Sequence, residues 1–343
     1  MVSKGRCRHR IRERFQPVKR MISGVGLLVS LAILTVMIWR LDWSTFVEAL
    51  VGINAAWLVV AVLFGFTGLA LRALRWNIVS GRPLREYSHF WRSAALGQLG
   101  NFIFPLRAGD ILRMMSLNKF ANVPIGQAVT SAVVDRVNDG FLLVVSMLVV
   151  LSIHGMEVIG GPAVISVVTT VGVMVVGAGG FVIWGHHATS LVDKFAMRLS
   201  AKWADRARKS FDHMLEVGAT FRRPARLSGM LVVDGLIVAG DVGVIAALFL
   251  TMGWDLPLAA ALTTIVFLWA GISLPSAPGF IGIYQISCVL ALGLYGIDEP
   301  AALAMSVILH LLALGLAVVQ GGVATLTYGI NLRQEYSQVV NQD

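Results

Sequence analysis

Two polar, turn-forming stretches interrupt long apolar runs of this sequence. The first reads GQLGNFIFPLRAGD at residues 97–110, and the second reads SLPSAPGFIG at residues 273–282. Proline removes a backbone hydrogen-bond donor and stops a helix, while glycine permits a sharp reversal of the chain. The segments 87–120 and 257–297 are therefore each predicted to form a helix, a break and a second helix.

The composition around these breaks is typical of a membrane protein. Of the 343 residues, 57% are apolar and only 14% are charged, whereas about a quarter of the residues of a soluble domain are charged. The fold class expected is an all-α integral membrane protein. Six apolar runs are long enough to cross a hydrocarbon core of about 30 Å, and they lie at residues 22–39, 54–71, 126–153, 158–185, 227–252 and 300–329.

Lysine and arginine predict the orientation of these helices. The net charge is +9, and a cytoplasmic N-terminus places 23 Lys and Arg on the inside against Arg40 alone on the outside. This bias predicts a multi-pass protein of a bacterial-type cytoplasmic (inner) membrane with both termini in the cytoplasm. The hairpin at 87–120 then enters from the cytoplasmic side and the one at 257–297 from the outside.

Two broken hairpins that enter from opposite faces are typical of an inverted repeat with a central site. The expected architecture is thus six transmembrane helices plus two re-entrant helical hairpins. The alternative is eight spans, with the second hairpin crossing the membrane fully.

The domain organisation follows from the same charge pattern. We expect a basic cytoplasmic tail at 1–21, a single membrane domain at 22–329 and a cytoplasmic C-terminal tail at 330–343. Apolar and basic residues alternate within the loop 186–226, which predicts an amphipathic helix on the inner leaflet. Basic segments beside apolar spans favour anionic lipid as the partner and argue against nucleic acid.

Charged side chains inside apolar segments are the first candidate site residues. Asp110 and Arg113 lie three apart after the first break, where they can pair on one helical face. Asp135, Arg136 and Asp139 enter the third full span, with the two carboxylates four residues apart. A neutralised structural pair and a role in transport both fit these residues.

Two further carboxylates, Asp234 and Asp241, lie seven residues apart on one face of the fifth span. No local cation accompanies them, so each needs a partner from another segment or a raised pKa that keeps it protonated. They are therefore candidates for proton coupling. His310 and Gln320 interrupt the last apolar run, and a polar contact is the expected role of the histidine.

Arg107 lies within the first break, between Pro105 and Gly109. Freed backbone N–H groups and a helix N-terminus favour an anion at this place, and a guanidinium can bind a phosphate bidentately. We therefore expect a phosphate-bearing ligand near the membrane, for which a lipid headgroup is the most available source.

Three spaced motifs carry a family resemblance, and they read NxxxPxRxGDxxR from Asn101, DRxxD from Asp135 and LPxxPGxxG from Leu274. In this order they resemble the membrane domain of lysylphosphatidylglycerol synthases and its stand-alone relatives, over roughly residues 20–330. The resemblance implies movement of lipids between leaflets, including aminoacylated phosphatidylglycerol and polyprenyl-linked or hopanoid-type lipids.

The same resemblance assigns the expected substrate-binding residues, which are Asn101, Arg107, Asp110, Arg113, Asp135, Arg136 and Asp139 on the cytoplasmic side and Pro275, Pro278, Gly279, Gly282 and Gln285 in the opposite hairpin. Two positions depart from the family pattern. Asp110 and Gln285 both stand where glutamate is usual, and the second change removes a charge. A mechanism or cationic-headgroup selectivity that relies on an acid at Gln285 is therefore in doubt.

The resemblance also bears on enzymatic activity. Aminoacyl transfer in that family belongs to a separate soluble domain, and this chain ends 14 residues after Gly329, so we expect no synthase activity and no enzyme. No Walker motif is present. No ligand-spaced Cys or His cluster is present either, and we expect no cofactor and no metal.

The expected function is therefore a lipid flippase or lipid transporter. Its expected partners are membrane lipids and a separately encoded lipid-synthesising enzyme, with homo-oligomerisation left open. Two alternatives stay open, namely a secondary transporter of a small soluble anion and a membrane-embedded lipid-modifying enzyme.

Overall fold

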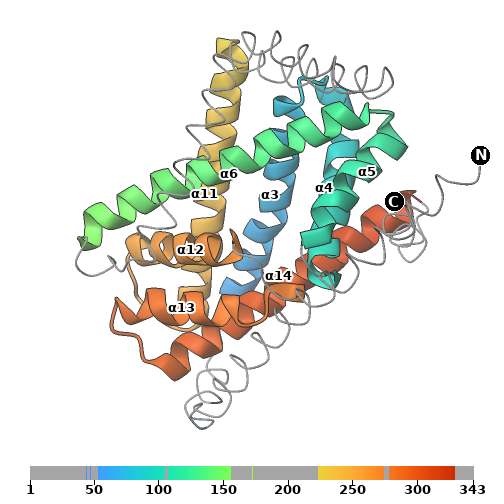
Figure 1. Cartoon of the computed structure of the whole chain (residues 1–343). Coiled ribbons are helices and arrows are strands. Elements are labelled where there is room, and N and C mark those ends of the chain that lie inside the picture. Colours follow the sequence, from blue (N-terminus) through green and yellow to red (C-terminus); the bar gives the residue numbers. More distant parts are fainter. Residues whose placement is uncertain are drawn as a thin grey trace, which may run out of the picture.

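The computed structural model describes residues 53–104, 107–155, 223–273 and 278–328, and the single residues Ser44, Val47 and Gly172. Within these ranges the regular structure is helical throughout, without any strand (Figure 1). Several predictions concern segments outside the described residues, namely the tails at 1–21 and 330–343, the helices at 22–39 and 158–185, and nearly all of the loop 186–226.

Four long helices are apolar and long enough to cross a membrane. They are α3 (Ala55–Val79), α6 (Ile125–His154), α11 (Pro224–Thr251) and α14 (Glu299–Tyr328). Four of the six helices expected from the sequence are thus confirmed as helices.

The boundary of one helix was predicted wrongly. The sequence placed the end of the second span at Leu71 and assigned Arg72 and Arg75 to a cytoplasmic loop, but α3 continues to Val79. Arg75 is 1% exposed, because its charge is neutralised inside the protein rather than by water. Removing both arginines from the cytoplasmic count still leaves 21 Lys and Arg against Arg40, so the predicted orientation is unchanged.

Local sequence explains where these helices begin and end. Asn54 caps α3, since its Oδ1 accepts a hydrogen bond from the Ala56 N–H at 3.1 Å. Pro224 opens α11, where a missing N–H costs nothing. Gly155, with φ 76°, follows α6 and turns the chain out of the helix.

Both predicted breaks are present. The first hairpin consists of α4 (Tyr87–Ile103) and α5 (Ala108–Ala121), preceded by the short 3-10 helix η1 (Leu84–Glu86). The second hairpin consists of α12 (Leu258–Ser273), the single 3-10 turn η4 (Pro278–Phe280) and α13 (Ile283–Gly293). Pro105 and Pro275 themselves lie outside the described residues.

Left-handed backbone marks both breaks. Arg107 has φ 54° and Phe280 has φ 57°, which are unusual for residues with a Cβ. Gly279 and Gly282 also have positive φ, at 72° and 85°. The chain therefore reverses sharply at both places where proline and glycine predicted a break.

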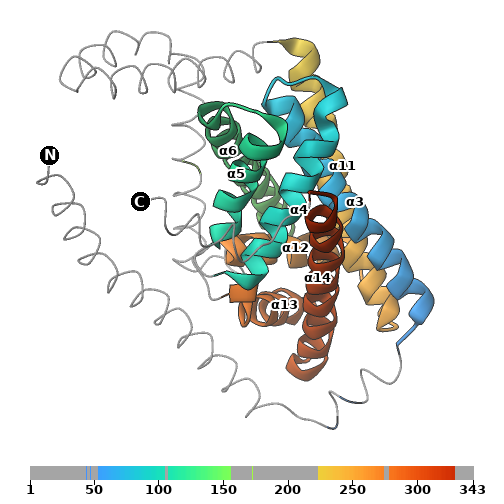
Figure 2. The same ribbon diagram turned by 90° about the vertical axis from the view of Figure 1, so that its right-hand side faces the viewer.

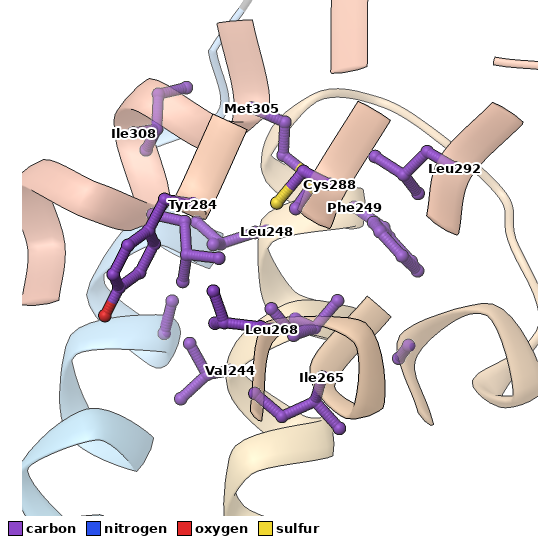
Figure 3. Close-up of a cluster of buried hydrophobic side chains, with 14 of the residues drawn as sticks. Val244, Leu248, Phe249, Ile265, Leu268, Tyr284, Cys288, Leu292, Met305 and Ile308 are labelled. Carbon is purple, nitrogen blue, oxygen red and sulfur yellow. The ribbon is translucent and has the colours of Figure 1, made fainter. Parts of the chain in front are cut away.

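Two packed regions hold the helices together. Figure 2 shows α3 and α11 side by side, and α14 lies against α4 and α13. Apolar side chains of α11, α12, α13 and α14 form one core (Figure 3), and those of α3, α4, α5 and α6 form another. Inside a membrane such packing stabilises mainly through van der Waals contact, because lipid tails are as apolar as the side chains.

The two arms of the first hairpin touch through glycine. A Cβ on Gly109 would lie 2.0 Å from the backbone oxygen of Gly97 and 2.5 Å from the backbone nitrogen of Asn101. A Cβ on Gly100 would lie 2.8 Å from the Gly109 Cα. Only glycine at position 109 permits this approach, which fixes α5 against α4.

Candidate functional site

A network of ion pairs joins the first hairpin to three long helices, and Arg75 of α3 lies at its centre. Its Nε donates to Asp135 Oδ1 at 2.9 Å, and one Nη donates to Asp234 Oδ1 at 3.2 Å. The other Nη donates to Asp139. One buried guanidinium thus links α3 to two carboxylates of α6 and one of α11.

Arg113 connects α5 to the same network. Both of its Nη atoms lie 3.2 Å from Asp135 Oδ2, and its guanidinium lies 4.6 Å from the ring centre of Trp76. The pair with Asp110 predicted from their spacing is longer, at 3.8 Å. Arg113 therefore binds chiefly to α6, which anchors the first hairpin there.

Arg136 completes the connection between α6 and α5. It donates to Asp110 across the two helices and to Asp139 Oδ2 at 2.8 Å along its own helix. The structure thus brings together all five charged residues expected near the first break, from Asp110 to Asp139. Asp135 pairs with Arg75 and Arg113 rather than with its sequence neighbour Arg136.

Asp234 and Asp241 both have partners from distant segments, which is the first of the two alternatives left by the sequence. Both oxygens of Asp234 accept from Asn138 Nδ2 at 2.9 Å, in addition to Arg75. Asp241 pairs with Arg72 of α3 and accepts from Trp269 Nε1 of α12 at 3.2 Å. The second hairpin is thereby tied to the α3–α11 pair.

Sequence reasoning missed four members of this network, namely Arg72, Arg75, Asn138 and Trp269. Arg72 and Arg75 were counted as loop cations. The apolar residues around them continue the helical spacing of α3 as far as Val79, and this spacing was the signal that could have placed both inside the helix. Nothing local in the sequence pairs them with Asp234 and Asp241.

Arg107 differs from the other arginines of the site. It caps the N-terminal end of α5 in left-handed backbone conformation. Within the described residues it makes no ion pair, whereas Arg75, Arg113 and Arg136 do. Its buried Nε has no hydrogen-bond partner, which is also true of the Nε atoms of Arg113 and Arg136. The nearby Asn101 Oδ1 is likewise buried without a partner. Both groups are polar and unsatisfied at the first break, where the sequence predicted a ligand.

The tips of the two hairpins meet. The rings of Phe102 and Phe280 form an edge contact with centres 5.7 Å apart, and the Arg107 guanidinium lies 5.9 Å from the Phe280 ring centre. A Cβ on Gly279 would lie 3.6 Å from the Phe102 backbone oxygen. Arg107 and Phe280, the two residues with left-handed backbone at the tips, thus contact each other.

The remaining expected residues of the second hairpin stabilise its turn. Gln285 Oε1 accepts from the Gly282 N–H at 2.9 Å, and its Nε2 lies 3.4 Å from His310 Nδ1. His310 Nε2 lies 2.6 Å from the Gly279 carbonyl oxygen, which fits donation by a neutral ring. His310 has the polar contact expected of it, while the side chain of Pro278 lies outside the described residues.

Exposure divides the network into a buried part and an accessible part. The side chains of Arg75, Asp135 and Asp234 are at most 3% exposed. Those of Arg136 and Asp139 are 39% and 35% exposed. A ligand can therefore reach the outer charges while the inner ones hold the helices in place.

The network contains five aspartates, which raises the question of a metal site. Within the described ranges, no group of three or more His, Cys, Asp or Glu residues is arranged to hold a metal ion. The acidic side chains point instead to arginines.

Comparison with known proteins gives two findings. A family model described as lysylphosphatidylglycerol synthase TM region matches residues 24–321. Glycosyltransferase AglD of Haloferax volcanii is 24% identical over 348 residues, which cover 92% of this chain and 55% of that protein. The chain thus spans about half the length of this curated relative.

Proposed function

The chain belongs to the family of the lysylphosphatidylglycerol synthase TM region, and on this basis we propose that this multi-pass membrane protein moves a phosphate-bearing lipid between the two leaflets. The lipids considered are a phospholipid, an aminoacyl-lipid, and a polyprenyl- or hopanoid-type lipid. The headgroup passes along the charged site while the tails stay in the bilayer.

The observation that carries this proposal is the state of Arg107. A buried hydrogen-bond donor without a partner costs about 1–3 kcal/mol, and more when the group is charged. Arg107 bears this cost without an ion pair in the described part of the chain, unlike Arg113 and Arg136, and it does so at a helix N-terminus, where the backbone also favours an anion. A phosphate bound there would satisfy the guanidinium and explain why no aspartate of the network does so.

The accessible charges next to Arg107 extend the site. Arg136 is a second cation within reach of a headgroup, while Asp110 and Asp139 neutralise it when the site is empty. Asn101 supplies an amide oxygen that can accept a hydrogen bond from a headgroup hydroxyl or amine. These residues are the proposed headgroup-binding residues of the first hairpin.

Helix length supports re-entrant hairpins as the architecture. At the usual rise of about 1.5 Å per residue, α5 with 14 residues is about 21 Å long. For α13, with 11 residues, the length is about 16 Å. Both fall short of a core of about 30 Å. The proposed hairpins enter from opposite faces of an inner membrane, with both termini cytoplasmic.

Asp234 and Asp241 are the proposed proton-coupling residues. Each is bound to an arginine, Arg75 and Arg72 respectively. Protonation of either carboxylate would weaken its ion pair. It would free Arg72 from Asp241, whereas Arg75 would keep its pairs with Asp135 and Asp139. A proton could in this way change the helix contacts or the charge that a headgroup meets.

A second candidate function has one observation in its favour, the similarity to AglD, whose name describes a glycosyltransferase. Under this candidate the chain takes part in glycosyl transfer to a lipid. Purified protein would be incubated with nucleotide sugars and polyprenyl phosphate, and a glycosylated lipid detected by mass spectrometry would support it over transport.

The proposed function is tested by lipid translocation in reconstituted vesicles. The tracers are labelled phosphatidylglycerol and labelled polyprenyl phosphate, and Arg107→Ala is compared with Arg85→Ala, a control in the exposed helix η1. We expect Arg107→Ala to abolish translocation and Arg85→Ala to leave it unchanged. Full activity of Arg107→Ala, or no movement of either tracer by the wild type, would contradict the proposal.

The same vesicles distinguish a lipid from a soluble anion. Uptake of inorganic phosphate or glycerol phosphate without lipid movement would favour the secondary transporter. Movement of the tracers without such uptake supports the lipid.

A further inference from the structure

The accessible charges of the network continue beyond the first hairpin. Arg72 of α3 is 36% exposed, close to the 39% of Arg136 and the 35% of Asp139, whereas Arg75 one turn away is 1% exposed. Asp139 and Arg75 both act electrostatically on Arg72. Cations and carboxylates thus alternate from Arg136 through Asp139 to Arg72, although only Arg136 and Asp139 are in direct contact.

Arg72 of α3 is connected to the second hairpin through Asp241. Its two Nη atoms pair with the two oxygens of Asp241, and Asp241 also accepts from Trp269 of α12. The Asp241 carboxylate therefore has a second donor that would hold it in place if the guanidinium turned to another partner.

A glycine leaves room for the guanidinium. A Cβ on Gly68 would lie 3.1 Å from one Nη of Arg72 and 3.6 Å from Asp241 Oδ1. The first distance is tighter than an ordinary contact, so a larger residue would crowd the charged end of Arg72. The space beside this arginine exists because Gly68 has no side chain.

The position along the helices places this pair deep in the proposed membrane. Asp241 lies ten residues before Thr251, the end of α11, which corresponds to about 15 Å. This is half of a core of about 30 Å. A partly exposed arginine side chain at such depth needs water or an anionic ligand near its charge, because lipid tails offer neither.

A purely structural role does not account for this exposure. An arginine that only ties α3 to α11 is expected to be as buried as Arg75, which performs that task with Asp234. Arg72 instead leaves 36% of its side chain exposed, and Asp241 neutralises its guanidinium in the absence of a ligand. Guanidinium groups are suited to phosphate because they can donate two parallel hydrogen bonds.

We propose that Arg72 and Asp241 form a second binding subsite for a phosphate-bearing lipid headgroup, reached after the site at Arg107 and Arg136. The inference rests on the proposed function and adds an intermediate binding site for the headgroup near the middle of the membrane. Asp241 releases Arg72 to the phosphate and stays bound to Trp269. After the headgroup leaves, the ion pair forms again.

The test uses a neutral replacement of the pair, Arg72→Gln with Asp241→Asn. These side chains can still hydrogen-bond to each other and to Trp269, so a structural role is retained without a charge. We expect the double variant to bind labelled phosphatidylglycerol in detergent like the wild type, through the first site. We expect its translocation rate in vesicles to fall about tenfold or more below that of Asp241→Asn alone, because the guanidinium donors are lost.

A second variant keeps both charges. Gly68→Ala crowds the Arg72 guanidinium and is expected to slow translocation several-fold, while Gly229→Ala in α11, where a Cβ meets nothing within 4 Å, is the matched control and should be unchanged. If the double variant has wild-type thermal stability, its translocation rate decides whether the second subsite exists. If it does not fold, the rate of Gly68→Ala decides.

Wild-type translocation by the deciding variant overturns the second subsite and shows that the pair is structural only. This failure is distinct from failure of the proposed function. In the latter case Arg107→Ala would also be fully active, whereas failure of the subsite alone leaves Arg107→Ala inactive.

Discussion

Arg75 offers the sharpest test of the ion-pair network. Replacing it with methionine removes a side chain that is 1% exposed and contacts three carboxylates. Breaking a buried ion pair by removing one partner costs about 3–5 kcal/mol. We therefore expect Arg75→Met to lower the free energy of unfolding by about that amount.

The structure also predicts which carboxylate is left without a cationic partner in Arg75→Met. Without Arg75, Asp135 keeps Arg113 at 3.2 Å and Asp139 keeps Arg136 at 2.8 Å. Asp234 keeps only the neutral amide of Asn138. Asp234 is thus the one carboxylate of the three that loses its cation.

A second substitution should therefore rescue selectively. Asp234→Asn added to Arg75→Met removes the unpaired charge and should recover about 2 kcal/mol. Asp135→Asn added to Arg75→Met is the matched control, and it should recover nothing because it deprives Arg113 of its partner. The measurement is unfolding in mixed detergent micelles, followed by circular dichroism. Equal rescue by the two substitutions, or a loss below about 1 kcal/mol for Arg75→Met alone, would refute this reasoning.

Three further predictions address the hairpins and the proton-coupling proposal. Gly109→Ala should reduce the thermal stability of the protein strongly, because the added Cβ would lie 2.0 Å from the Gly97 backbone oxygen; an unchanged melting temperature would show that the arms are not in contact. Cysteines at Phe102 and Phe280, joined by a short thiol cross-linker, should stop translocation, and reductive cleavage should restore it; transport by the cross-linked protein would show that the tips need not separate. Asp241→Asn imitates a protonated carboxyl, so its translocation should lose the pH dependence of the wild type, and an unchanged pH profile would count against proton coupling there.

Much of the fold was predictable because proline, glycine and hydropathy act locally. The breaks in both hairpins follow from residues that cannot continue a helix, and four long helices follow from apolar runs. The end of α3 was not predictable by the same rule, because an arginine in an apolar segment was taken to mark the water boundary. The charge of Arg75 is instead neutralised by ion pairs with carboxylates of other helices.

The candidate site was predictable in its members but not in its pairing. The spacing of Asp110, Arg113, Asp135 and Asp139 identified them as charges in apolar surroundings. Their partners depend on tertiary contacts over long sequence separations, such as the 159 residues between Arg75 and Asp234. Similarly, the contact between Arg107 and Phe280 requires both hairpin tips to be placed.

The glycine contact between the arms of the first hairpin has a mechanical consequence. Because the Gly97 and Gly109 backbones touch, α4 and α5 cannot come closer or slide past each other without a clash. We therefore expect the two arms to move as one unit, with any hinge located before Tyr87 or after Ala121. Arg107 lies between the two arms, so under the proposed function a headgroup bound to it would travel together with both arms.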